Sequence, residues 1–239
     1  MTLPTLPLQR LILAKPLNPQ SPKLSGLSPY ELREGFASCG CNGCELGCQP
    51  NFVGPVVYRG NPDSKVMLIG EAPGLYEDRE GIPFTGPAGK VLDEMFAEVG
   101  YDTGKDLYIT NVVKCRPVSD VPGKQNLTPS QAHRDACRPY LDQEIHYIQP
   151  HTVGLLGGVA AKSVLGLDKY VKVSNIVGRL FLREEYPFVQ FFVFYHPAYI
   201  LRVRNDPAKK KEVWPLVQKH VEDFIKLVHD MEKIGVIND

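Results

Sequence analysis

The sequence predicts an α/β protein of three layers, in which helices cover both faces of a four-stranded, mostly parallel sheet. Short apolar runs of strand length alternate along the chain with patterns of helical periodicity. Several of these runs end in loops rich in glycine and proline. With 239 residues, of which 43% are hydrophobic, the chain is long enough for one well-buried domain. Ligands of this fold class bind where the carboxyl ends of the strands open into loops.

Each element follows from a local pattern. Residues 1 to about 35 are rich in Pro, Ser and Leu without regular periodicity, so we expect an extended N-terminal arm before a single domain over residues 36–239. Thr128, Pro129 and Gln131 suit the N-cap, first turn and capping box of a long helix. In order, we expect a strand over 66–69, a helix around 91–96, a strand over 107–113, a helix from 129 to about 148, a strand over 152–156, a helix over 159–165 and a strand over 188–195.

The first residues and the net charge restrict the compartment and the partners. Pro4, Pro7, Arg10 and Lys15 interrupt every apolar run there, so we expect no signal peptide, and no stretch is long enough to span a membrane. We expect a cytoplasmic protein with reduced thiols, so the six cysteines are better explained as metal or cluster ligands than as disulfides. Because the formal net charge is zero, a nucleic acid would have to be held by local basic patches.

The cysteines form a pattern of their own, with four of them crowded into residues 39–48. Cys41 and Cys44 have the two-residue gap that lets two thiolates bind one centre, and adjacent elements can bring Cys115 and Cys137 to them. The spacing therefore favours these four as a four-thiolate site. The alternative is that Cys115 and Cys137 are ordinary buried residues and that a zinc knuckle stands alone near the N-terminus. Thiolate ligands by themselves do not separate zinc from a 4Fe-4S cluster.

Three ordered motifs carry a resemblance to a known family. The first covers residues 70–78 (GEAPGLYED) and 81–89 (GIPFTGPAG), the second residues 109–117 (ITNVVKCRP) and the third residues 195–202 (YHPAYILR). Together they closely resemble the motifs of family 4 uracil-DNA glycosylases, an iron-sulfur branch of the uracil-DNA glycosylase superfamily.

The resemblance implies a four-stranded parallel sheet between helices, removal of uracil from DNA, and a structural 4Fe-4S cluster. The ligands of that cluster would be Cys41, Cys44, Cys115 and Cys137. Two features depart from the family pattern, the first being the additional cysteines Cys39 and Cys48. The second is the stretch over residues 118–127, which is longer than the usual family loop between the last two ligands.

Two residues suit the recognition of a flipped base. An enzyme that attacks the bond between a base and its sugar must flip the nucleotide out, stack the ring, read its edge and stabilise the departing anion. Phe84 can supply the stacking face, although a core phenylalanine is equally normal at this position. Asn111, at the end of a strand, matches N3-H and O4 of uracil with its amide and mismatches cytosine. Its alternative role is a turn residue that bonds its own backbone.

Two further residues suit the chemical step. His196 follows an aromatic strand and can donate a hydrogen bond to uracil O2 as negative charge develops there. Glu71 is the candidate to orient a water or to stabilise the positive sugar. Ala72 stands where a familiar family of uracil glycosylases has an aspartate base, and we assign it to the base pocket together with Glu77. We interpret Asp78 as a solvated loop edge.

The third motif and the segment after it suit contact with DNA. Residues 202–211 contain five basic residues against a single acid, and Arg202 is the first of them. Backbone donors between Gly86 and Gly89 can grip a phosphate, and Ile200 and Leu201 can wedge into the base stack where the nucleotide left. The alternative for the lysines is a solvated helix start.

The sequence thus predicts a DNA repair glycosylase that flips uracil out of single- or double-stranded DNA, hydrolyses its N-glycosidic bond and acts as a monomer. One alternative is a relative that traps the abasic sugar covalently through a histidine after the middle motif, but residues 118–128 contain no histidine. The others are a non-catalytic DNA-binding module and a redox or zinc protein. The joint presence of Glu71, Phe84, Asn111 and His196 favours the enzyme.

Overall fold

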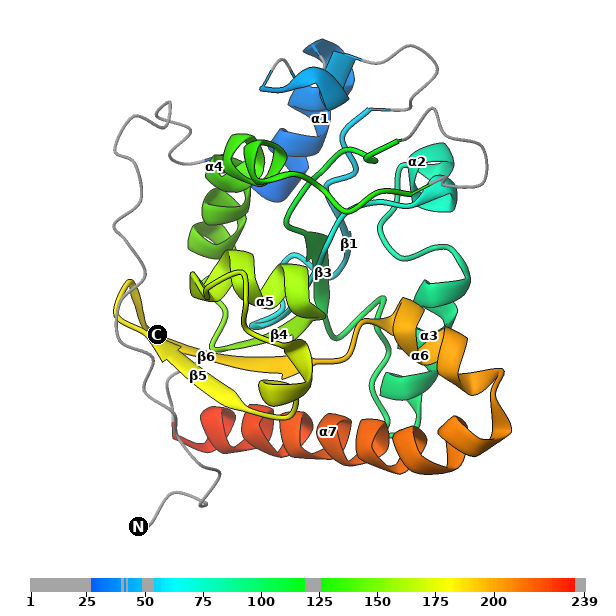
Figure 1. Ribbon diagram of the computed structural model, residues 1–239. Coiled ribbons are helices and arrows are strands. Elements are labelled where there is room, and N and C mark those ends of the chain that lie inside the picture. The colour runs from blue at the N-terminus through cyan, green and yellow to red at the C-terminus, as the bar shows by residue number, and fades with distance from the viewer. Residues whose placement is uncertain (1–26, 40, 42, 49–53, 119–125, 235–239) are drawn as a thin grey trace.

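The computed structural model describes residues 27–39, 41, 43–48, 54–118 and 126–234, and within them a central sheet lies between helices (Figure 1). The strands of the sheet are β1 (Tyr58–Gly60), β2 (Val66–Gly70), β3 (Tyr108–Asn111), β4 (Thr152–Leu156), β5 (Leu180–Arg183) and β6 (Tyr186–Phe194). The α-helices are α1 (Pro29–Cys39), α2 (Leu75–Glu80), α3 (Pro87–Ala97), α4 (Gln131–Ile148), α5 (Gly158–Leu165), α6 (Pro197–Arg204) and α7 (Pro207–Lys233), with short 3-10 turns at Glu45–Cys48 and Val173–Asn175.

The sheet contains the four expected parallel strands and two more. Its order is β1-β3-β2-β4-β6-β5, in which β3, β2, β4 and β6 pair in parallel. The expected count of four strands is wrong for the edges, where β1 and β5 pair antiparallel with β3 and β6. β1 has only three residues and no apolar run, whereas β5 begins with the short apolar run of residues 180–182, which was not predicted to form a strand.

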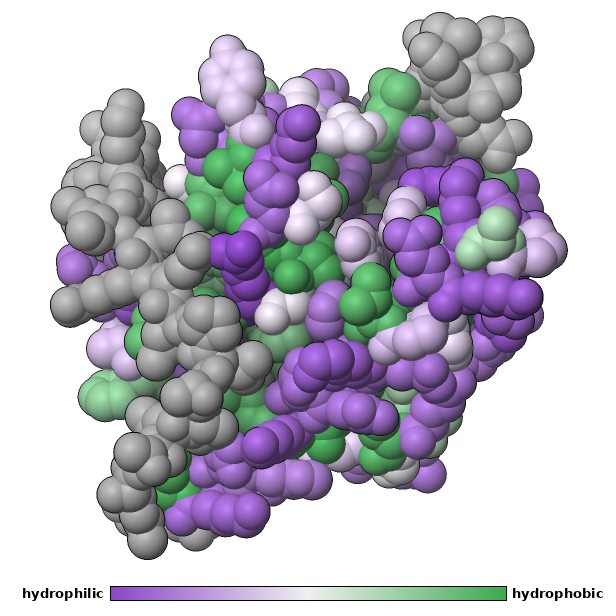
Figure 2. Space-filling view, turned by 60° about the horizontal axis from the view of Figure 1, so that its bottom comes forward, coloured by the Kyte–Doolittle hydropathy of each residue, from purple (hydrophilic) through white to green (hydrophobic). Residues whose placement is uncertain are grey.

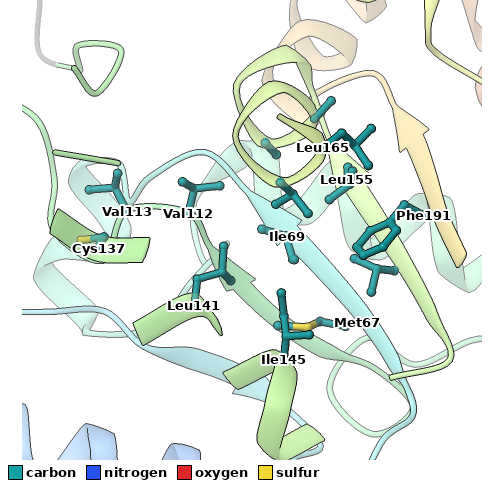
Figure 3. Close-up of a cluster of buried hydrophobic side chains, with 14 of the residues drawn as sticks. Met67, Ile69, Val112, Val113, Cys137, Leu141, Ile145, Leu155, Leu165 and Phe191 are labelled. Carbon is teal, nitrogen blue, oxygen red and sulfur yellow. The ribbon is translucent and has the colours of Figure 1, made fainter. Parts of the chain in front are cut away.

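Alternation along the strands sends side chains to two separate cores, which produces the expected three layers. On β2, Met67 and Ile69 face the core formed with α1, α4 and α5. Val66 and Leu68 face the opposite core, formed with α3, α6 and α7. Figure 3 shows the first core, in which the buried face of α4 meets the sheet and the loop that follows β3.

A helix replaces the last part of the expected arm. Residues 1–26 lie outside the described residues, but α1 begins at Pro29, so the expectation of an extended chain to about residue 35 is wrong there. The Ser28 hydroxyl accepts from the Glu31 N–H, and the Glu31 carboxylate accepts from the Ser28 N–H. This capping box, followed by a proline at the first position, starts the helix, and Leu32 fixes it by burial in the core.

Helix α4 begins two residues later than predicted. Its N-cap is Ser130 and not Thr128, because the Ser130 hydroxyl accepts from the His133 N–H while the His133 ring accepts from the Ser130 N–H. The capping box is therefore formed by Ser130 and His133, and the predicted one with Gln131 is wrong. Among the residues that the structure describes, no helix is long and apolar enough to cross a membrane.

Candidate active site and cysteine site

A pocket of about 600 Å³ opens at the carboxyl ends of the parallel strands. Its walls come from the loops after β2, β3 and β6, as expected for this fold class. It brings together the predicted residues Glu71, Ala72, Glu77, Phe84, Gly86, Asn111, His196, Leu201 and Arg202. The lining also includes Tyr76, Asn126, Leu127 and Thr128, none of which was predicted as a site residue, Thr128 having been expected only as a helix cap.

Gly70 lets the side chains of Phe84 and Asn111 meet at the floor of this pocket. A Cβ at Gly70 would lie 2.4 Å from Asn111 Oδ1 and 2.5 Å from Phe84 Cζ. Any side chain larger than hydrogen at residue 70 would therefore displace the amide or the ring. The signal for this role was present in the sequence, because a glycine that ends a buried strand marks a close approach of another group.

Asn111 holds an acceptor that has no partner in the protein. The residue is 1% exposed, and its Oδ1 atom is buried without a hydrogen bond from any described residue. A buried acceptor without a donor destabilises a protein by about 1 to 3 kcal/mol. Because Asn111 lines the pocket, the unpaired oxygen is available to a donor on a ligand.

His196 is held as a neutral donor. It is the N-cap of α6, and its Nδ1 accepts from the Ala198 N–H at 3.1 Å. Burial, with the nearby Arg202 charge, lowers the pKa of His196 to about 4, so the ring is neutral at pH 7. Since Nδ1 is an acceptor, the proton of the neutral ring lies on Nε2. Gly157 makes room for this ring, because a Cβ there would lie 2.8 Å from His196 Cβ.

Glu71 directly follows β2 and lies on the pocket wall. Burial raises the pKa of this carboxyl, while a hydrogen bond with Thr128 and the charge of Arg134 act in the opposite direction. A carboxylate with a raised pKa is a stronger base than a solvated one. Ala72, next to it, leaves no second carboxylate at the position of the aspartate base.

Glu77 lines the pocket, but both of its oxygens are already used. One accepts from the Gly74 N–H at 3.0 Å and the other from the Gly86 N–H at 2.9 Å. The carboxylate therefore joins the loop after β2 to the start of α3. The Gly86 N–H, predicted as a phosphate donor, is occupied by this bond.

Some of the residues predicted to contact DNA lie on the rim of the pocket, and others are buried in the interior. Leu201 and Arg202 lie on the rim, but Ile200 is 2% exposed and packs in the core, so its predicted role as a wedge is wrong. These neighbours point in different directions because consecutive residues of a helix are about 100° apart. Gly89 is buried too, and a Cβ there would lie 1.7 Å from the Phe84 carbonyl oxygen, so this glycine serves packing rather than phosphate binding.

The basic residues of the segment 202–211 are less available to phosphates than the composition of the segment suggests. Arg204 pairs with Glu94, and Lys209 pairs with Asp206 at 3.2 Å. On the face that α7 covers, hydrophilic residues dominate the surface (Figure 2). Arg202 remains an exposed basic residue beside the pocket.

The prediction that Asp78 lies at a solvated loop edge is wrong. It is 5% exposed, and its carboxylate lies 3.8 Å from the Arg116 guanidinium. Arg116 also donates to the Asn126 side chain at 3.0 Å, and the Leu127 N–H donates to the Pro117 carbonyl at 3.1 Å. These bonds hold the pocket-lining residues Asn126 and Leu127 in place.

The four predicted cysteine ligands lie close together at the opposite end of the β3 loop. Cys41, Cys115 and Cys137 are buried, and Cys44 is half-buried. Burial and the other three thiols raise the pKa of Cys115, and burial raises that of Cys137 to about 11. Figure 3 shows Cys137 beside Val113 at the end of the apolar row of α4. The side chains of Cys39 and Cys48 lie outside the described residues.

The chemistry of these donors fits an iron-sulfur cluster. Four neighbouring thiols can each supply one thiolate, and the N–H groups of Lys114 and Gly43 already point at the sulfurs of Cys137 and Cys41, both at 3.5 Å. Within the described ranges, no three His, Cys, Asp or Glu side chains are placed to hold a single metal ion. Four thiolates suit a 4Fe-4S cluster and a zinc ion alike.

Lys114 links the cysteines to the pocket. Besides the bond from its N–H to Cys137, its Nζ donates to the Asn111 carbonyl at 2.9 Å and pairs with Glu144. Both charged groups of this pair are buried. Breaking a buried ion pair typically destabilises a protein by about 3 to 5 kcal/mol. The pair was missed because Lys114 and Glu144 lie on elements whose contact cannot be read from spacing.

Comparison with known proteins identifies the class of protein to which this fold, its pocket and its cysteines belong. Residues 57–218 match the model of the Uracil DNA glycosylase superfamily. A Type-4 uracil-DNA glycosylase of Archaeoglobus fulgidus is 36% identical over 165 residues, which cover 67% of this chain and 78% of that protein. One from Thermotoga maritima is 33% identical over 174 residues, or 71% of this chain and 82% of the relative. One from Pyrobaculum aerophilum is 39% identical over 140 residues, or 57% and 68%.

The chain therefore belongs to the uracil DNA glycosylase superfamily and, within it, to the type-4 family. The resemblance that the three motifs carry is confirmed.

Proposed function

We propose that this protein is a uracil-DNA glycosylase of DNA repair, which flips uracil out of DNA and hydrolyses its N-glycosidic bond to leave an abasic site. Type-4 relatives of this kind match most of the chain. The observation that carries the proposal is the buried, unpaired Oδ1 of Asn111 in the pocket.

The unpaired oxygen selects a base that offers a donor. Uracil presents N3-H to Asn111 Oδ1 and O4 to the amide nitrogen, so binding satisfies the buried acceptor. Cytosine presents an acceptor at N3 and would leave Oδ1 unsatisfied. The Phe84 ring lies on the same floor and supplies a stacking face, which is worth about 1 to 3 kcal/mol per base.

In the chemical step, the neutral His196 acts on the leaving base and the carboxylate of Glu71 acts on the sugar and the water. As the glycosidic bond stretches, negative charge develops on uracil O2, and the Nε2–H of His196 donates to it. Glu71 faces the sugar side, where it stabilises the developing positive charge and orients the attacking water. Leu201 and Arg202 on the rim contact the stack and the phosphates of the strand.

We propose that Cys41, Cys44, Cys115 and Cys137 hold a 4Fe-4S cluster. When bound, the cluster ties α4 to the loops that precede β1 and follow β3, which is a structural contribution. Cysteines that serve as cluster ligands suit a reducing cytoplasm, and we propose that the protein acts there as a monomer.

The test is excision from matched oligonucleotides that contain uracil, cytosine or thymine at one position, single-stranded or in a duplex. We expect release of free uracil and an alkali-labile site only from the uracil strands. Asn111→Ala should abolish most of this release, and Asn175→Ala, at an exposed asparagine outside the pocket, should leave it unchanged.

The same assay separates the alternatives. Binding of uracil DNA without release of the base would contradict the proposal and indicate a non-catalytic module. A protein-DNA adduct stable to denaturing detergent would indicate covalent trapping instead. Equal release from wild type and Asn111→Ala would remove Asn111 from base recognition.

A further inference from the structure

The base-stacking residue has a strained backbone. Phe84 has φ of 55°, the left-handed region that residues with a side chain rarely adopt. A bulky residue persists there only when its surroundings hold it, and such strain gathers at ligand sites. Something in the structure must therefore hold Phe84 in this conformation.

Arg59 on the edge strand β1 makes that contact. Its Nη1 donates to the Phe84 carbonyl at 3.1 Å. Its Nη2 pairs with Asp93 on α3 at 2.5 Å and donates to Thr103 at 3.1 Å, and the Thr103 hydroxyl donates to Asp93 at 2.6 Å. The Arg59 side chain is only 15% exposed. The guanidinium is therefore fixed on one side and holds the Phe84 carbonyl with the other.

The surroundings of the Phe84 carbonyl leave it little freedom. Its oxygen lies against the backbone of Gly89, where no Cβ could fit, and its ring lies against Gly70. Without the Arg59 bond, the strained backbone of Phe84 would relax toward an ordinary conformation and rotate the ring away from the pocket floor.

We propose that Arg59 is a positioning residue for uracil excision, which acts by holding Phe84 in the strained conformation that presents its ring to the flipped base. This role rests on the proposed glycosylase function. A planar guanidinium can bond a carbonyl and a carboxylate in fixed directions at once, which a lysine ammonium does less well.

Arg183 provides a matched control at the other edge of the sheet. It lies on β5, pairs with Glu185 at 2.5 Å and donates to the Val164 carbonyl, so it makes the same two kinds of contact. Neither Arg183 nor its partners line the pocket. A general structural effect of losing an edge-strand arginine should therefore appear in both variants.

The experiment measures thermal stability, DNA affinity and single-turnover release of uracil for Arg59→Ala, Arg59→Lys and Arg183→Ala. We expect Arg59→Ala to slow release about tenfold, which corresponds to about 1.4 kcal/mol, with DNA affinity changed less than twofold. Arg59→Lys, the variant for use if the alanine form does not fold, should slow release severalfold. Arg183→Ala should release uracil at the wild-type rate even where it lowers the melting temperature.

A double-mutant cycle with Phe84→Ala decides whether Arg59 acts through Phe84. In the Phe84→Ala background, we expect Arg59→Lys to change the rate less than twofold. The inference is overturned if both Arg59 variants release uracil at the wild-type rate, or if their effect persists in full without the Phe84 ring. Wild-type release of uracil in the same series shows that such a failure concerns Arg59 and not the glycosylase function.

Discussion

Replacing His196 with alanine should remove the donor that acts on uracil O2 while leaving the rest of the pocket in place. The magnitude follows from the state of the ring. With a pKa of about 4, only about one molecule in a thousand carries a charged imidazole at pH 7, so the donor is a neutral N–H. Loss of one preorganised neutral donor to a developing oxyanion slows catalysis about 100- to 1000-fold, or about 2.7 to 4 kcal/mol.

The acid side of the pH profile provides a second readout. His196 remains neutral from pH 8 down to about pH 5, so we expect no loss of rate at its ordinary pKa of 6.5. Burial raises the pKa of Glu71, so we expect protonation of Glu71 to lower the rate before the pH reaches the range near 4 in which His196 becomes charged. That fall should disappear in Glu71→Gln.

The assay is single-turnover release of uracil from one oligonucleotide, with DNA affinity measured in parallel. A donor used in the transition state affects the rate more than binding. If His196→Ala loses DNA affinity but keeps its rate, the assignment of His196 to the leaving group is refuted. A wild-type ionisation near pH 6.5 that vanishes in His196→Ala would refute the neutral donor.

The remaining predictions concern specificity, the cluster and DNA affinity. Asn111→Asp should lose the donor to O4 and lower uracil excision at least tenfold, and the test is the ratio of uracil to cytosine release. Cys115→Ala should lose iron and lower the melting temperature, as measured by absorbance near 400 nm and by thermal denaturation, while an unchanged iron content would reject this ligand. Arg202→Ala should weaken DNA binding and reduce its salt dependence while changing the single-turnover rate little, and a salt titration of both quantities checks this.

The inner sheet and the pocket could be predicted because each depends on a local signal. The strand of residues 66–69 is a continuous apolar run and that of residues 152–156 is mostly apolar, and a parallel sheet places the loops after them at one edge. Asn111 is the last residue of β3 and His196 lies two residues beyond the end of β6, so their meeting follows from topology.

What could not be predicted depends on contacts between distant elements. Ile200 and Leu201 are equally apolar, and only the packing of α6 decides that the first is buried and the second faces the pocket. Asp78 reads as a surface acid until Arg116 is brought to it by the fold. The strain at Phe84 has no sequence signal, because left-handed backbone is normally predicted from a glycine or an asparagine at the position.

Hydrogen bonds join the residues on the two sides of the segment 119–125, and they affect how much a change in the length of that segment costs in stability. We call these flanking residues, 116–117 and 126–127, the stem. The Leu127 N–H donates to the Pro117 carbonyl, and Arg116 donates to Asn126, so the chain is fastened together on the two sides of residues 119–125. Cys115 and α4 are positioned outside this stem and do not depend on what it encloses. Each doubling of an enclosed loop adds only about 0.6 kcal/mol of closure entropy. The extra length noted in the sequence therefore costs little stability, and a segment added between the fastened residues would leave the pocket and the cysteines in place.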